Sequence, residues 1–303
     1  ERMGGRDKPG HDDSGIKLEA DGRAAHPSRV IYERWTPPAP LDQFIQNLWY
    51  WESDEAPDHA KDTIMASAHM GILINLGADE LFWYGGEKFH VQSKLRGIAL
   101  CGTHAKNFAI DAFQPRMMGI RFQPGGAWPF FGPTGLDFYN NHLSLEDFWG
   151  GSRAHSLHMQ LVETPGIAGK FKVLLKALLD HAPRPLEHSA AVSMALQRFG
   201  RAPISSRVKK TADDADLSQK KFIRHFTREV GFTPKLYLRV ARFQKLLQKV
   251  SAMPTVDWAP LAAEHGYYDQ PHLIRDFREF CGFTPTQYLA MRGPFEQHLP
   301  LPE

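Results

Sequence analysis

Short apolar stretches separated by turn residues run through the first half of the chain, from about Pro27 to Gly126. Such stretches, bounded by glycine, proline, asparagine and aspartate, are typical of β-strands. Many short strands at similar spacing indicate a small β-sandwich or barrel. We predict strands at Val30–Trp35, Gln46–Trp51, Gly71–Leu76, Leu81–Tyr84, Ile98–Cys101, Phe108–Ala112 and Met117–Phe122.

Apolar positions follow a helical period over most of the second half. Gly169–His181 has leucines and a phenylalanine near helical spacing, and Ser189–Arg198 fits another helix. Pro183 and Pro185 interrupt the pattern, so Ala182–Glu187 is predicted to be a linker. Shorter helices are expected at 127–132, Ser144–Trp149 and Ser156–Glu163, and one in the first half at Leu41–Leu48, where Leu41, Phe44, Ile45 and Leu48 share one side.

The last hundred residues contain an internal repeat. Sliding this part of the chain on itself by 51 residues matches eleven of the 33 positions from 208 to 240 without a gap. In each copy a helix with small side chains is followed by a short turn, and Ser218 or Asp269 is placed to cap the next helix. That helix ends at Gly231 or Gly282. A Phe-Thr-Pro sequence then starts a further helix, with threonine as the N-cap and proline in the first turn.

The middle helix of each copy is amphipathic. Its apolar side carries Phe222, Phe226 and Val230 in the first copy and Leu273, Phe277 and Cys281 in the second. The other side carries Lys220, Arg224 and Thr227, or Pro271, Arg275 and Arg278. An amphipathic helix behind a short turn from another helix fits a helix-turn-helix, in which the apolar side anchors the helix and the other side enters a major groove.

Charge supports this interpretation. The net charge is only +2, but residues 198–292 hold 17 Lys+Arg and 9 Asp+Glu, which leaves the rest of the chain at −6. A basic segment suits a polyanion, most commonly nucleic acid. A helical repeat with solvated basic faces and no role in DNA binding is the alternative.

These residues resemble the AraC/XylS family of bacterial transcriptional regulators. The pattern Ala-x5-Ser-x3-Phe-x-Arg-x-Phe-x4-Gly-Phe-Thr-Pro-x2-Tyr spans 212–237, and the second copy runs from Ala263 to Tyr288. The resemblance covers about Ile204 to Arg292 and implies two helix-turn-helix subdomains joined by a helix at about Pro234–Val250. Their recognition helices would enter successive major-groove segments about one turn, ~34 Å, apart.

The resemblance also implies DNA-contacting residues. Base contacts carry over to the recognition helices, and two threonines at helix starts would face phosphates. Ile223 and Ile274 fit partial core as well as base contacts, and Pro271 cannot hydrogen-bond a base, so the second copy is expected to read less directly. The expected set is Gln219, Lys220, Lys221, Ile223, Arg224, Thr233, Gln270, Pro271, His272, Ile274, Arg275 and Thr284.

The first half resembles, more loosely, the sensor modules that precede such domains. The similar stretch is Met118–Gly126 with the segment 128–132 after it. The fold class expected is α+β: an amino-terminal cupin-like β-barrel with flanking helices, then an all-α domain of two helix-turn-helix subdomains joined by a linker helix. The expected parts are a disordered tail (1–26), a β-barrel sensor and dimerisation domain (27–150), a helical connecting segment (151–197), the DNA-binding domain (198–293) and a tail (294–303).

The expected partners follow from the same resemblance. They are double-stranded DNA, a small-molecule effector in the barrel that shifts the DNA-binding domain between two arrangements, RNA polymerase and a second copy of the chain. The sequence does not identify the effector. The sequence contains no run of eighteen apolar residues, so no membrane partner is expected. It also shows no secretory signal, so we expect a cytoplasmic location.

No enzymatic activity, cofactor or metal is expected. The sequence lacks Gly-x-Ser-x-Gly, a phosphate-binding glycine loop and His-Glu-x2-His. The amino-terminal histidines are scattered, and the two cysteines, Cys101 and Cys281, fit buried free thiols. The alternative function is a metal- or thiol-dependent enzyme, or a DNA-repair protein, with an appended helix-turn-helix. The aromatic segments Trp49–Trp51 and Ala127–Phe131 fit either a ligand pocket or ordinary core.

Overall fold

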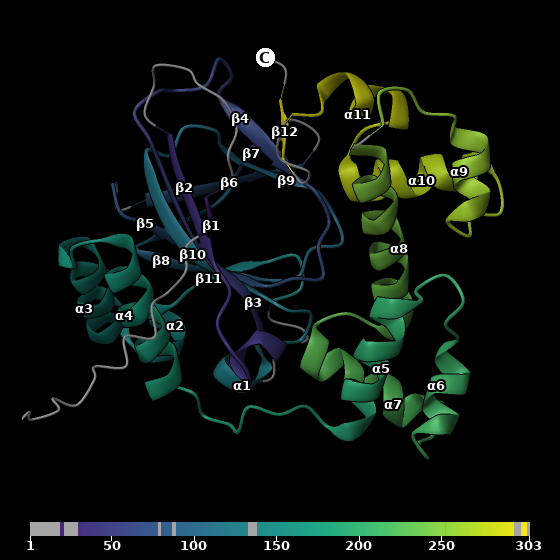
Figure 1. Ribbon diagram of the computed structural model, residues 1–303, viewed down its shortest axis with the longest axis horizontal. Coiled ribbons are helices and arrows are strands. Elements are labelled where there is room, and N and C mark those ends of the chain that lie inside the picture. The colour runs from purple at the N-terminus through teal and green to yellow at the C-terminus, as the bar shows by residue number, and fades with distance from the viewer. Residues whose placement is uncertain are drawn as a thin grey trace, which may run out of the picture.

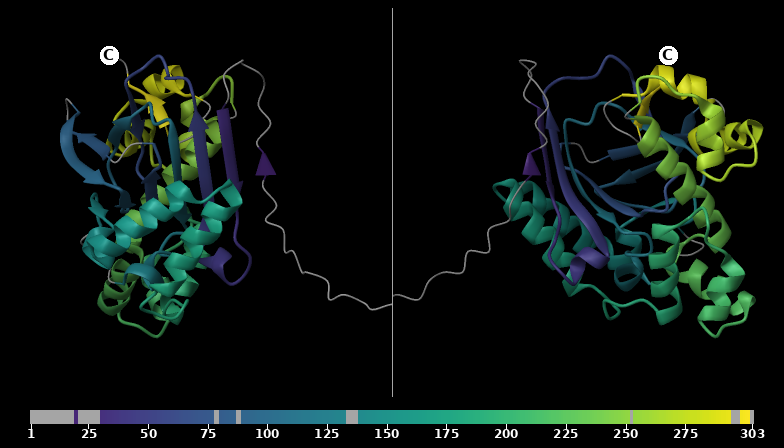
Figure 2. Two further views of the ribbon diagram at one scale, coloured as in Figure 1. Left: turned by 90° about the vertical axis from the view of Figure 1, so that its left-hand side faces the viewer. Right: turned by 45° about the vertical axis from the view of Figure 1, so that its right-hand side comes forward.

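The structure is a computed structural model that describes residues 19–20, 30–77, 80–86, 89–132, 138–251, 253–293 and 298–301. Two antiparallel β-sheets form one half of the molecule and a group of helices forms the other (Figure 1). The long helix α8 (Pro234–Ser251) runs alongside the sheets and carries a cluster of helices at each end, as the two further views confirm (Figure 2). No helix in the described ranges is long and apolar enough to cross a lipid bilayer.

Every strand predicted from the apolar pattern is present, with ends within two residues of the prediction. One sheet has seven strands in the order β1 (Glu19–Ala20), β2 (Val30–Trp35), β3 (Ile45–Ser53), β10 (Arg116–Phe122), β5 (Gly71–Asn75), β8 (Ile98–Cys101) and β11 (His142–Ser144). The other has five, in the order β12 (His298–Pro300), β4 (Lys61–Ile64), β9 (Phe108–Asp111), β6 (Glu80–Gly85) and β7 (His90–Arg96).

The prediction of a barrel needs correction, because the described strands form two separate sheets. A barrel closes only when strand pairing continues around it. Here β1 and β11 end one sheet, and β12 and β7 end the other. Trp49, Trp51 and Leu73 of the seven-stranded sheet pack against an apolar cluster that includes Trp83 of the five-stranded sheet. The first half is therefore a β-rich unit with an aromatic core between its sheets.

The helix predicted at Leu41–Leu48 is wrong. A 3-10 turn covers Leu41–Gln43, and β3 starts at Ile45. The pairing of β3 with β10 shifts between Arg121 and Phe122. This β-bulge lets Ile45 and Leu48, three residues apart, bury on the same side, so the strand imitates a helical spacing.

Helices cover the outer face of the seven-stranded sheet. The leucine and phenylalanine side chains of α3 (Gly151–Glu163) and α4 (Ile167–Asp180) pack on that face. The predicted helices at 127–132 and Ser144–Trp149 are the single turns α1 (Trp128–Phe131) and α2 (Glu146–Trp149). The aromatic residues of α1 are buried, as expected for core.

The helical half begins with α5 (Ala190–Arg201), which crosses the domain boundary expected between 197 and 198. Phe199 on α5 lies 5.7 Å from Phe226, between ring centroids, and belongs to the same core. The remaining helices are α6 (Val208–Asp214), α7 (Gln219–Val230), α8, α9 (Trp258–Glu264), α10 (Gln270–Cys281) and α11 (Pro285–Met291).

Each of the two tails expected from the sequence contains a short strand. Within 1–26, Glu19 and Ala20 form β1, and the rest lies outside the described residues. Within 294–303, residues His298–Pro300 form β12, which pairs antiparallel with β4. The end of the helical half is therefore joined to the five-stranded sheet.

Candidate nucleic-acid interface

The repeat in the sequence is a repeat in the structure. Helices α7 and α10 have equal lengths, and their bounds differ by the same 51 residues as the sequence match. Ser218 Oγ accepts a hydrogen bond from Lys221 N at 3.3 Å, and Asp269 Oδ1 accepts one from His272 N at 2.8 Å. Gly231 and Gly282 end the two helices with φ of 85° and 84°, in the left-handed region that favours glycine. The predicted caps are therefore confirmed.

The apolar faces of both helices are buried against α8. Phe226 of α7 meets Tyr237 at 5.6 Å between ring centroids, and Phe277 of α10 meets Phe243 at 5.1 Å. Both pairs are edge-to-face, a favourable geometry for aromatic rings. One continuous apolar core joins the two copies, so α8 fixes their relative position.

The faces predicted to read DNA point away from this core. Four of the predicted residues are partly buried, and the others are exposed. The four are Ile223, His272, Ile274 and Thr284. The exposed residues of the recognition helices are Gln219, Lys220, Lys221, Arg224, Gln270, Pro271 and Arg275.

Several predicted contacts already have partners within the protein. His272 Nδ1 accepts a long hydrogen bond of 3.5 Å from Tyr268 N. Thr233 Oγ1 accepts one from Leu236 N at 3.3 Å, and Thr284 forms a capping box with Gln287. The threonines therefore hold the starts of α8 and α11 in place.

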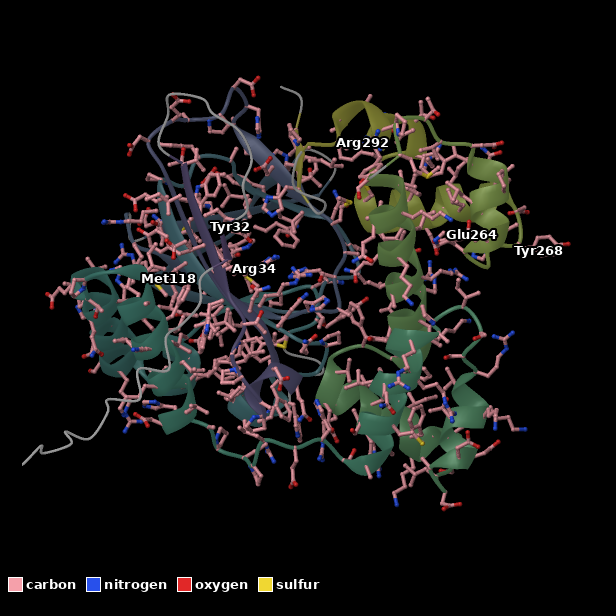
Figure 3. The ribbon with its side chains drawn as sticks, in the orientation of Figure 1. Tyr32, Arg34, Met118, Glu264, Tyr268 and Arg292 are labelled. Atoms are coloured by element: carbon pink, nitrogen blue, oxygen red, sulfur yellow. The ribbon has the colours of Figure 1, made fainter. Side chains whose placement is uncertain are left out.

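One exposed residue at this surface was missed by the sequence analysis. Tyr268, in the turn before α10, is 93% exposed and projects away from the molecule (Figure 3). Its counterpart 51 positions earlier is Leu217, which is partly buried. The difference between an aromatic and an aliphatic residue at one repeat position could have drawn attention to it.

A buried carboxylate locks α10 to α8. Asp276 is 1% exposed, and its two oxygens accept from Arg239 Nη2 at 2.7 Å and Arg242 Nη2 at 3.2 Å. Arg239 also pairs with Glu279 at 2.7 Å. Burial lowers the pKa of the Arg239 guanidinium, but its hydrogen bonds to the two carboxylates outweigh burial and raise it, so the charge is permanent. These arginines are therefore structural and not part of the exposed basic face.

The β-rich half holds both copies at equivalent positions. An added Cβ on Gly231 would lie 2.9 Å from Thr103 Oγ1, and one on Gly282 would lie 2.5 Å from Asn107 Nδ2. Thr103 and Asn107 belong to one segment, the loop 102–107 between β8 and β9. Ala66 N also donates to Phe280 O at 2.8 Å. The turns at Gly231 and Gly282, which we call the glycine corners, therefore both rest on this single loop of the β-rich half.

Comparison with known families decides what the repeat is. The model of a helix-turn-helix domain, HTH_18, matches residues 211–291, which contain α7, α8 and α10. Residues 211–291 are an AraC-type helix-turn-helix domain. This confirms the family resemblance and, with it, a DNA-binding regulator of transcription.

The β-rich half ahead of the AraC-type domain matches a different family model. Residues 33–144 match a domain of unknown function, DUF6597. No curated protein matches the chain.

Several solved structures of regulators are similar to this chain over part or most of its length. The carboxy-terminal domain of AraT, a response regulator from Geobacillus stearothermophilus, is 21% identical over 36% of this chain and 90% of that one, with a TM-score of 0.32. ToxT from Vibrio cholerae is 8% identical over 80% of this chain and 97% of that one, with a TM-score of 0.41. The AraC-like transcriptional activator CuxR is 12% identical over 73% and 81%, with a TM-score of 0.29.

The alternative function would need a cluster of metal ligands or a reactive thiol. Within the described ranges, no three histidine, cysteine or acidic side chains gather in a way that could hold a metal ion. Burial raises the pKa of the Cys101 and Cys281 thiols to about 12, so neither is an activated nucleophile at neutral pH.

Proposed function

We propose that the protein is an effector-responsive regulator that reads two successive major-groove segments, one with α7 and one with α10. The observation that carries this proposal is the pair of outward faces on helices that share one core through α8. A rigid link between the two helices gives one bipartite footprint on one face of the duplex.

The two copies are proposed to contribute unequally. In α7 the exposed Lys220, Lys221 and Arg224 combine phosphate contacts with bidentate readout of guanine. In α10, Gln270 and Arg275 are exposed, but Pro271 offers no donor. Tyr268 adds a hydroxyl beside this helix, where it would reach a phosphate oxygen.

The test begins with binding to duplex DNA. Protein selected against a random duplex library should recover a preferred sequence, and its affinity should fall steeply with salt because counterions are released. Arg224→Ala should cost about 1–3 kcal/mol at the selected site and relax the base preference there.

Lys176→Ala, on an exposed face of α4, serves as the control and should bind as the unchanged protein does. Absence of salt-sensitive duplex binding would refute the proposal. An Arg224→Ala variant with unchanged base preference would remove that residue from readout.

Effector response is proposed because the β-rich half is packed against both reading units. The loop 102–107 contacts both glycine corners, so a ligand that shifts the β-rich half would move the ends of both α7 and α10. A second copy of the chain and RNA polymerase stay predictions from the family resemblance.

A further inference from the structure

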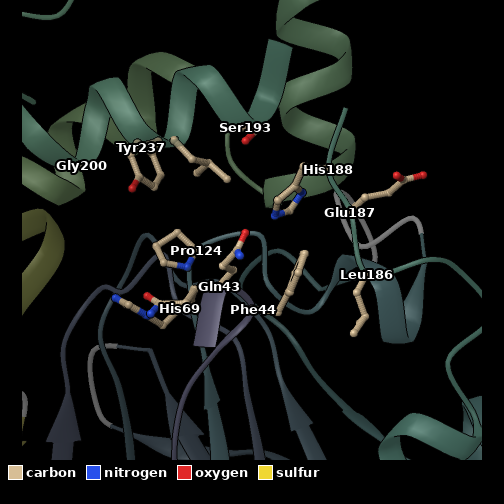
Figure 4. A pocket seen from close by; sticks show the side chains of 12 residues that line it. Gln43, Phe44, His69, Pro124, Leu186, Glu187, His188, Ser193, Gly200 and Tyr237 are labelled. Atoms are coloured by element: carbon tan, nitrogen blue, oxygen red, sulfur yellow. The ribbon is translucent and has the colours of Figure 1, made fainter. Parts of the chain in front are cut away.

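A cavity of about 560 Å³ lies where the β-rich half meets the first helix-turn-helix copy. This volume is within the usual range for small-molecule sites, roughly 300–1,000 Å³. Its floor is the end of the seven-stranded sheet, and its roof is formed by α5 and the start of α8 (Figure 4). The lining residues that matter most for its chemistry are Phe44, His69, Gln123, His188, Ser193 and Tyr237.

One side chain in this cavity lacks a partner that its burial demands. His188 is 9% exposed, and its Nδ1 lies 3.2 Å from Glu229 Oε2. Within the described residues, its buried Nε2 has no hydrogen-bond partner. An unpaired buried nitrogen costs free energy, roughly 1–3 kcal/mol, so a group that binds it is favoured.

The hydrogen-bonding pattern defines the kind of ligand. Burial raises the pKa of Glu229, but hydrogen bonds from His188 and Ser189 outweigh it and lower the pKa, so the carboxylate is ionised and Nδ1 of His188 is the donor. His69 donates from Nδ1 to Phe122 O at 2.8 Å, which leaves its Nε2 as an acceptor. Gln123, Ser193 and Tyr237 can each donate and accept.

Charge narrows the choice further. None of the described residues that line the cavity is lysine or arginine, and the imidazole of His188 already faces a carboxylate. An anionic ligand would therefore lack a free counter-charge. Phe44 and Pro124 supply apolar surface beside the polar groups. Glu187 also lines the cavity, so among the described residues its lining includes an acidic side chain but no lysine or arginine. An uncharged molecule with hydroxyl or amide groups on an apolar frame therefore fits the lining better than an anion does.

The same histidine connects the cavity to a recognition helix. Glu229 is 2% exposed and belongs to the last turn of α7, the first reading helix. It also accepts from Ser189 N at 3.2 Å. A ligand bound to His188 is thus one hydrogen bond away from α7.

We propose that this cavity is the effector site and that it takes a small uncharged molecule bearing hydroxyl or amide groups, held at His188 Nε2. The inference rests on the proposed effector response but places the site at the junction with the first helix-turn-helix copy, outside the space between the sheets.

Benzamide is a suitable probe, and benzoate is its charged counterpart. Ligand-observed nuclear magnetic resonance on the full chain should show benzamide binding at least about tenfold more tightly than benzoate, a difference of about 1.4 kcal/mol. Gly200→Leu should weaken benzamide binding by at least the same factor, because Gly200 lines the cavity and a Cβ there meets nothing within 4 Å.

Two further variants separate cavity filling from unfolding. Ala190→Leu, at an exposed position of the same helix, should leave benzamide binding unchanged. His188→Ala should abolish the preference for benzamide over benzoate. Gly200→Leu and Ala190→Leu should keep the circular dichroism and melting temperature of the unchanged chain, since both add a side chain at an exposed helical position and remove no contact. His188→Ala removes a partner of the buried Glu229, so it should keep its circular dichroism but melt at a lower temperature.

The inference is overturned if benzamide does not bind, or if Gly200→Leu binds it as well as Ala190→Leu does. Duplex binding is measured on the same samples. Loss of duplex binding in the unchanged protein would refute the proposed function, whereas normal duplex binding without a benzamide site would refute only the inference.

Discussion

At the scale of single residues, one buried carboxylate holds α10 against α8. Asp276 pairs with two arginines of α8 from a position that is 1% exposed. Removing one partner of a buried ion pair leaves the remaining charge buried and unpaired. This costs much more folding free energy than the loss of an exposed pair. Glu279 shares Arg239 with Asp276 but is 43% exposed, so the two carboxylates form a natural comparison.

Asp276→Asn should lower the free energy of unfolding by about 3 kcal/mol, because it leaves Arg239 and Arg242 without their buried counter-charge. Glu279→Gln should lower it by less than about 1 kcal/mol. Urea unfolding followed by circular dichroism would measure both. Equal effects of the two substitutions would contradict a structural role for the buried carboxylate.

At the scale of elements, the helices of the repeat were predictable because their signals are local. Ser218 and Asp269 cap within three residues, and Gly231 and Gly282 end each helix at the next position. The strands with clear apolar patterns were predictable for the same reason. The strand β7, with its mostly exposed side chains, and the three-residue strands β11 and β12 were not, because only pairing with distant segments makes them strands.

The candidate site divides in the same way. The exposure of the outward faces of α7 and α10 could be predicted, because the apolar residues that bury the opposite faces recur at helical spacing in the sequence. The contacts of the glycine corners with Thr103 and Asn107, and of His188 with Glu229, join residues far apart in the chain. A single sequence contains no signal for such contacts, so the cavity and the docking of the two halves emerged only from the structure.

The glycine corner after α7 is expected to tolerate no side chain. Gly231→Ala forces alanine into the left-handed region, at about 1–2 kcal/mol, and also brings its Cβ 2.9 Å from Thr103 Oγ1. Gly150 has a similar φ of 82° but open space around it. Gly231→Ala should therefore destabilise the protein more than Gly150→Ala in thermal unfolding. Adding Thr103→Ala should recover part of the difference, and no recovery would contradict the steric explanation.

At the scale of the whole molecule, the last strand ties the helical half to the β-rich half. Strand β12 pairs with β4, and Leu301 N donates to Lys61 O at 2.9 Å. Beside this pairing, Asp62 lies 2.9 Å from His59 Nε2 and 3.8 Å from His298 Nδ1. The tie therefore includes two groups with a shifted pKa, His59 and Asp62.

The strength of this tie should depend on pH. Burial lowers the pKa of His59, but hydrogen bonds to Asp58 and Asp62 outweigh it and raise the pKa above 6.5, so its stabilisation is present below pH 6.5 and lost as the pH rises through the raised value. Burial raises the pKa of Asp62, but its two histidine partners lower it below 3.8, so its contribution is lost only in stronger acid.

Amide hydrogen exchange at Leu301, corrected for intrinsic rates, should therefore be slowest in mildly acidic solution and faster above neutral pH. His59→Gln should remove most of that dependence. An exchange rate that stays constant across this range in the unchanged protein would rule out the titrating tie.

The loop 102–107 lets two properties of the proposed DNA site change independently: the bases that are read and the distance between the two segments that are read. In the proposed function, the bases that are read depend on outward side chains of α7 and α10, and these can be substituted without changing the loop. How far apart the two reads fall depends on α8 and on the seats that Thr103 and Asn107 provide for the two corners. A descendant of this protein could thus acquire a new target sequence one side chain at a time, while the distance between the two segments of that DNA target stays the same. A new interval would require α8 and the contacts of Thr103 and Asn107 to change together.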